Sequence, residues 1–146
     1  MAAILHGVER TTLDIDISVS LAPANVPRLV AAMEKLGLQS RVPVNPLVLA
    51  DPEEVRKIIE QKHAVVFTFV HPRDPFLHVD VFLVPDLQYE KLIPHAVEKE
   101  FSGGTLKVLS AEHLLKLKKA IRPPRKKDEW DIEALEEILR QRRGKA

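Results

Sequence analysis

The sequence has no cysteine, one tryptophan and one tyrosine, and none of its apolar runs approaches the length of a membrane span. Without cysteine there can be no disulfide, no thiolate metal site and no cysteine nucleophile. A membrane-spanning helix needs about 20 mostly apolar residues, so we expect no membrane partner. The first residues, MAAILHG, lack the basic region, long apolar core and cleavage site of a signal peptide. We therefore expect a cytoplasmic protein.

The chain also has little net charge. Its 22 Lys and Arg residues nearly balance its 21 Asp and Glu residues, for a formal charge of +1. Overall charge therefore gives no argument for a nucleic-acid partner. The 146 residues are 45% hydrophobic and 29% charged, which is typical of one globular domain with a real core. We expect a single domain over residues 1–146, with C-terminal helices in 110–143 packed on it.

Polar and apolar residues alternate through residues 13–20, LDIDISVS. A period of two predicts a β-strand with one apolar face and one polar face. Asp14 and Asp16 then lie on the same face, about 6.5–7 Å apart along the strand. Two carboxylates at this spacing can converge on one or two cations, which would relieve their repulsion. The residues alone leave a second interpretation open, an amphipathic strand whose outer face is acidic.

A second pair of strands is predicted at residues 64–70 and 77–84. The short proline-containing turn HPRDPF between them favours an antiparallel hairpin. In the second strand Asp80 alternates with valines and shares a face with His78 and Phe82. An unpaired carboxylate inside an apolar strand is costly, so Asp80 needs a partner or a metal ion. It would supply a third carboxylate to the pair at Asp14 and Asp16.

The remaining segments are mostly helical. Helical spacing and capping residues predict helices at residues 2–6, 25–36, 51–62, 86–101, 110–121 and 127–143, the fourth interrupted by Pro94. Residues 41–49 are predicted to form a loop with at best an edge strand. Residues 105–110 are predicted to form a short strand after a Gly-Gly turn. The order predicts an α+β fold with a small mixed or antiparallel sheet and helices packed mainly on one face.

The chain resembles the nucleotidyltransferases of the DNA polymerase β superfamily. The resemblance rests on three segments in order: HGVERTTLDIDISV, HVDVFLV and LSAEHLLKLKKAIRPPRKKDEWDIEALEEIL. It is greatest to small bacterial proteins related to abortive-infection toxin nucleotidyltransferases, and it covers nearly the whole chain. It implies a nucleotidyltransferase-like fold and transfer of a nucleotidyl group from an NTP to a hydroxyl of a small molecule, RNA or protein.

The resemblance also implies a metal site. Asp14, Asp16 and Asp80 would bind two Mg²⁺ ions, and Asp80 would either hold the ion that activates the attacking hydroxyl or act as its base. Mg²⁺ prefers carboxylate oxygens and retained water, so three aspartates suit it. Two cations about 3.5–4 Å apart can stabilise both the attacking and the leaving oxygen in such a transfer.

Four further residues receive roles from the resemblance. Lys118 would act in catalysis by reaching the triphosphate, and Arg10 and Thr12 would meet phosphates or position the acceptor. Asp128, in a terminal acidic motif with Asp131, would orient Lys118 or the acceptor.

One family motif has no counterpart in the sequence. In the family a strand ending in Gly-Gly or Gly-Ser precedes the first helix and cradles the phosphates, whereas MAAILHG matches only the helix that follows. We expect either that the true start lies upstream of Met1 or that the cradle is lost. Loss would favour an inactive nucleotidyltransferase-fold binding module, such as half of a toxin–antitoxin pair, or an enzyme completed by a partner protein or a homo-oligomer.

The other chemical groups receive structural interpretations. The six histidines are scattered without metal-ligand spacing. Trp130 and Tyr89 are expected to pack helices rather than to stack on bases. The basic cluster between Lys116 and Lys127 could guide a phosphate-bearing substrate or RNA, but it lacks interleaved aromatic residues, so apart from Lys118 a solvated face is favoured.

Overall fold

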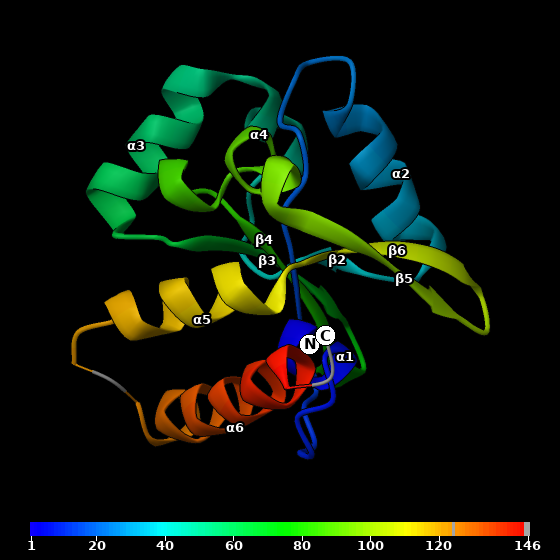
Figure 1. The fold of residues 1–146 in the computed structure, drawn as a ribbon. Coiled ribbons are helices and arrows are strands. Elements are labelled where there is room, and N and C mark those ends of the chain that lie inside the picture. The colour runs from blue at the N-terminus through cyan, green and yellow to red at the C-terminus, as the bar shows by residue number, and fades with distance from the viewer. Residues whose placement is uncertain (124, 145–146) are drawn as a thin grey trace. The chain divides into compact units, whose positions relative to one another are not determined.

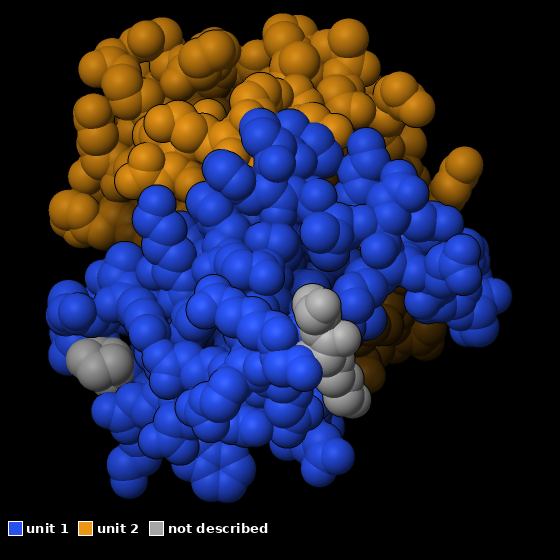
Figure 2. Space-filling view, in the orientation of Figure 1, with its two compact units in different colours: residues 1–11, 93–146 blue, residues 12–92 orange. Residues whose placement is uncertain are grey.

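The computed structural model describes residues 1–123 and 125–144, except for the side chain of Asp14. These residues form two compact units, residues 12–92 and residues 1–11 with 93–146, which are coloured separately in Figure 2. The unit of residues 12–92 contains a four-stranded sheet with helices, and the unit of residues 1–11 and 93–146 contains a two-stranded sheet with helices. The predicted α+β class is confirmed.

The unit of residues 12–92 is built on a mixed sheet with strand order β1-β4-β3-β2 (Figure 1). Strand β1 is parallel to β4, and the other two pairings are antiparallel. The predicted hairpin is therefore present as β3 and β4. The elements are β1 (Asp14–Ile17), α2 (Val26–Lys35), β2 (Gln39–Ser40), η1 (Pro46–Ala50), α3 (Pro52–Lys62), β3 (Val66–His71), β4 (Asp74–Phe82), η2 (Pro85–Leu87) and α4 (Tyr89–Leu92).

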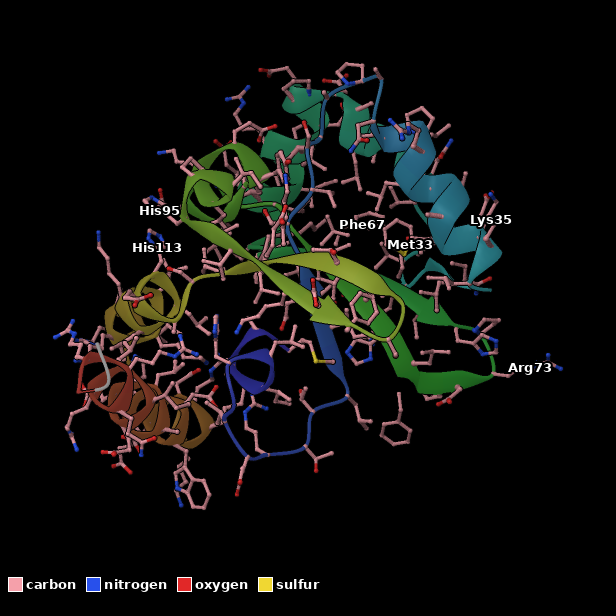
Figure 3. All side chains as sticks on the ribbon, turned by 45° about the vertical axis from the view of Figure 1, so that its right-hand side comes forward. Met33, Lys35, Phe67, Arg73, His95 and His113 are labelled. Carbon is pink, nitrogen blue, oxygen red and sulfur yellow. The ribbon has the colours of Figure 1, made fainter. Side chains whose placement is uncertain are left out.

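The core of this unit lies between the sheet and helices α2 and α3. The apolar stripe of α2 meets alternate residues of β3 and β4, and Met33 and Phe67 are two of the side chains in this layer (Figure 3). Leu36, the last residue of the helix predicted over residues 25–36, is 61% exposed because it lies beyond the last turn of α2. Helix α3 begins as predicted, since the Asp51 carboxylate accepts hydrogen bonds from the amides of Glu53 and Glu54.

The unit of residues 1–11 and 93–146 packs an N-terminal turn, a hairpin and two helices. Helices α5 and α6 run antiparallel side by side (Figure 1) and bury a small core of Ala3, Val8, Ala111, Leu135 and Leu139. No helix among the described residues is both long and apolar enough to cross a bilayer. The elements are α1 (Ala2–Leu5), η3 (Ile93–His95), β5 (Ala96–Phe101), β6 (Gly104–Leu109), α5 (Ala111–Ala120) and α6 (Lys126–Arg143).

The prediction of a helix over residues 86–101 is wrong. This segment forms η2, α4 and η3, and its last six residues form strand β5, paired with β6. Val97 and Phe101 are four residues apart and therefore fit a helical stripe, yet they also lie on one face of a strand. The Gly103-Gly104 turn brings β6 back alongside, and Gly104 has a φ of +131°, which favours glycine. The segment forms a strand rather than a helix because β5 can hydrogen-bond to β6.

Candidate functional site

Asp16 of β1 and Asp80 of β4 lie on one face of the sheet. In the parallel pairing Asp14 is opposite His78 and Asp16 is opposite Asp80, while Ile15 and Ile17 pair with valines of the core. Side chains of a strand alternate between its faces, so the partners Asp16 and Asp80 share the face opposite the core. Adjacent strands lie about 4.8 Å apart. The two carboxylates are therefore neighbours, as the sequence predicts.

Thr68 of β3 extends this polar row to a third strand. It is the pairing partner of Asp80, and its hydroxyl donates a hydrogen bond of 2.5 Å to Asp80 Oδ1. Sequence reasoning overlooked Thr68. Thr68 lies between Phe67 and Phe69, and alternation along a strand therefore predicts that Thr68 points away from the core when the two phenylalanines point into it. Both phenylalanines are buried in the structure. The hydrogen bond fixes the orientation of the Asp80 carboxylate.

The donor chemistry of this row suits a hard cation. Asp16 is exposed and Asp80 is half-buried, so at least the Asp16 carboxylate is accessible to a hydrated ion. Carboxylate oxygens are the ligands that Mg²⁺ prefers, and the hydroxyl of Thr68 would be an outer-shell partner. Among the described side chains, which exclude that of Asp14, no cluster of three His, Asp or Glu residues could hold a metal ion. A site with three carboxylates thus depends on Asp14.

A second group of predicted residues meets in the other unit. Asp131 accepts two hydrogen bonds from Arg10, at 2.7 Å from Nε and 3.1 Å from Nη2, and its Oδ2 lies 2.8 Å from Lys118 Nζ. Lys118 Nζ also donates to Asp128 Oδ1 at 2.8 Å, and Arg125 donates to the same carboxylate. Three cations therefore surround two carboxylates. We call these five residues the charge cluster.

Burial and charge act in opposite directions on the two aspartates of the charge cluster. Both side chains are fully buried. Burial by itself would raise the pKa of Asp128, but hydrogen bonds from Arg125 and Lys118 outweigh it and lower the pKa to about 2. The pKa of Asp131 is also lowered, since the hydrogen bonds from Arg10 and Lys118 exceed the effect of burial. Both carboxylates are ionised at neutral pH.

The predicted site residues thus occur in two groups. Asp14, Asp16, Asp80 and Thr12 belong to the unit of residues 12–92, where Thr12 is half-buried just before β1. Arg10, Lys118 and Asp128 belong to the other unit. The predicted contact between Asp128 and Lys118 is present. The roles assigned to these residues in binding and catalysis stay predictions.

No protein-family model matches the chain. No curated protein or solved structure matches it significantly either. The resemblance to nucleotidyltransferases therefore rests on the motifs alone.

A hollow of about 620 Å³ lies near the carboxyl ends of β1 and β4. Its lining combines Ser20 and Glu90, which share a hydrogen bond of 2.6 Å, with apolar residues such as Leu49 and Val55. Leu49 and Val55 belong to the core on the helix-covered face of the sheet, opposite Asp16 and Asp80. We therefore do not assign this hollow to the acidic row.

One further expectation is corrected in the unit of residues 1–11 and 93–146. Trp130 of α6 is 73% exposed, so it does not pack helices together. The buried positions of α6 are Asp128, Asp131, Leu135 and Leu139, and Trp130 lies outside the face they define. An exposed indole of this size needs another explanation.

Proposed function

We propose that this protein is a Mg²⁺-dependent nucleotidyltransferase, moving a nucleotidyl group from an NTP to a hydroxyl acceptor. The observation that carries the proposal is the pairing of Asp16 with Asp80 on parallel neighbouring strands, with Asp14 two residues before Asp16 in the same strand. Two or three carboxylates gathered on one sheet face are what a two-cation transfer site requires.

The chain's residues receive the following tasks. Asp14, Asp16 and Asp80 hold Mg²⁺, which when bound stabilises charge on the attacking and leaving oxygens. The hydroxyl of Thr68 keeps the Asp80 carboxylate oriented through the hydrogen bond to Oδ1. In the transfer, the acceptor oxygen bonds to the α-phosphorus and the bond from that phosphorus to the bridging oxygen breaks. Pyrophosphate leaves, and the hydroxyl proton passes to Asp80 or to solvent.

The charge cluster is proposed to contribute a phosphate-binding cation. An ammonium group has three donors, and those of Lys118 reach Asp128 and Asp131. The third donor of Lys118 is proposed to bind a phosphate group. The three cations and two carboxylates of the charge cluster leave one net positive charge, which favours an anionic ligand.

The test compares NTP binding and label transfer in matched variants. The wild-type chain should bind an NTP by calorimetry only with Mg²⁺ present, and it should transfer label from an α-labelled NTP. Asp16→Asn and Asp80→Asn should each lower the transfer rate by a factor on the order of 100 or more, because each removes a charged ligand. Thr68→Val should lower it roughly 10- to 100-fold, the usual cost of losing an outer-shell partner.

Asp86→Asn is the control, because the Asp86 side chain is 92% exposed and the substitution removes the same charge from the same unit. It should leave both readouts unchanged. Absence of binding for all four NTPs in the presence of Mg²⁺ would count against the proposal. Binding without transfer would instead favour a non-catalytic binding module.

A further inference from the structure

The strongest unassigned feature is a basic segment beside an exposed aromatic ring. Residues 116–127, KLKKAIRPPRKK, contain seven Lys or Arg residues and no Asp or Glu. Lys118 is largely buried in the charge cluster, and the other six are exposed. They span the second half of α5, the connection and the first turn of α6. The chain is nearly neutral overall, so this is a local concentration of positive charge.

At least two of the six exposed cations are paired with carboxylates within the unit. Lys119 pairs with Glu136 at 2.5 Å, and Arg125 pairs with Asp128. The guanidinium of Arg122 donates to the backbone carbonyls of Lys119 and Ile121, which hold the side chain in place, and Arg122 lines a hollow together with Glu129 and Glu133.

Trp130 lies next to this charge on α6. It follows Lys126 by four residues and Lys127 by three, so the three side chains are neighbours on the helix surface. Helical side chains lean toward the N-terminus, which directs the indole over the turn that carries the two lysines and away from Glu133. Lys126 is about 6 Å from Trp130 along the helix axis. A large flat ring, 73% exposed, thus borders a row of cations.

We propose that Trp130, Lys126, Lys127 and Arg122 form a binding surface for single-stranded nucleic acid. A base stacks on the indole and the flanking phosphates pair with the lysines and the arginine. Sequence-tolerant single-strand sites combine these two elements, a cationic track and an aromatic platform. An acidic peptide would use the cations but has no face to stack on the ring, and a duplex keeps its bases stacked internally. The surface does not depend on the aspartates of β1 and β4.

The test uses the full-length chain and exploits the fact that Trp130 is its only tryptophan. Oligouridylate or oligothymidylate of about 12 nucleotides, within the usual site sizes, should quench the intrinsic fluorescence. With three phosphate contacts the salt slope for a single strand is about −2, so affinity should fall roughly 18-fold between 50 and 200 mM salt. Tighter binding of the RNA or of the DNA would identify which kind of nucleic acid is preferred, and either result supports the proposed binding surface.

Variants separate the stacking from the charge. Trp130→Ala, followed by anisotropy of a labelled oligonucleotide, should lose roughly 5- to 150-fold in affinity with the salt slope unchanged. Lys126→Gln with Lys127→Gln should weaken binding and reduce the slope by about 1.4. The matched control is Lys35→Gln with Lys62→Gln, two exposed lysines of the other unit, which should bind like the wild type.

Three outcomes would overturn the proposal. The first is no quenching and no anisotropy change with any single strand at 50 mM salt. The second is unchanged affinity in Trp130→Ala, which would leave the ring without a role. The third is equal binding of a duplex or of a glutamate-rich peptide of the same length, which would show a surface that recognises charge alone. Circular dichroism should show every variant folded, since the substituted side chains are exposed.

Discussion

The charge cluster permits a sharp prediction about stability. The Asp131 side chain is fully buried and receives two hydrogen bonds from Arg10 and an ion pair from Lys118. Asp131→Ala would remove this carboxylate partner from both cations. Removing one member of a buried ion pair typically costs about 3–5 kcal/mol. Since the side chains of Arg10 and Lys118 are 23% and 14% exposed and Lys118 keeps Asp128, we expect the lower end, about 3 kcal/mol.

Urea unfolding followed by far-ultraviolet circular dichroism measures this cost, and urea adds no ions that would screen the charges. The matched control is Glu137→Ala on the same helix. Glu137 pairs with Arg140, but its side chain is 48% exposed, so its loss should change the free energy of unfolding by about 0.5 kcal/mol or less.

A double-mutant cycle assigns the cost to the contact itself. Arg10→Met combined with Asp131→Ala should be more stable than the sum of the single changes predicts, by at least about 1 kcal/mol, because the second change removes a partner that is already lost. If Asp131→Ala costs no more than Glu137→Ala, or if the two changes are additive, the cluster is solvated and the reasoning from burial is refuted.

Three further predictions concern pH and backbone conformation. Asp128, with a folded pKa of about 2 against 3.8 unfolded, stabilises the fold at pH values above about 4, and about 2.5 kcal/mol should be lost as the pH falls from 4 toward 2. Asp128→Asn should abolish that part of the acid dependence in urea titrations, and an unchanged slope would contradict it. The pKa of His113 is lowered by burial and by His95, whose ring stacks on it at 3.9 Å (Figure 3), so the unfolded chain protonates first and stability should fall as the pH drops below about 6.5. His113→Phe keeps a stacking ring and should show a smaller fall between pH 7 and 5; an equal fall would assign it to other groups. Gly104→Ala should lower the free energy of unfolding by about 1–3 kcal/mol, because φ is +131° there, whereas Gly144→Ala at the end of α6 should change it little. Equal costs at the two glycines would contradict the argument from φ.

Local patterns predicted much of the fold. Asp51 and Ser110 cap α3 and α5 as expected, because a cap depends on residues within one turn of each other. Alternation placed Asp80 on the polar face of β4 and its valine neighbours in the core. The secondary structure of β5 was predicted wrongly because both a helical and a strand period fit its sequence. The burial of Trp130 was predicted wrongly because it depends on which face of α6 is packed.

The sequence by itself determined the types and faces of most elements, since helix and strand periods and caps act over a few residues. It also predicts that Asp14 and Asp16 share a face. Only the tertiary structure decided that Asp16 pairs with Asp80 and that Thr68 bonds to Asp80, because strand order and register depend on packing between distant segments. The contact between Arg10 and Asp131, 121 residues apart, is likewise set by how α1, α5 and α6 pack, since no local pattern links two charges at that separation.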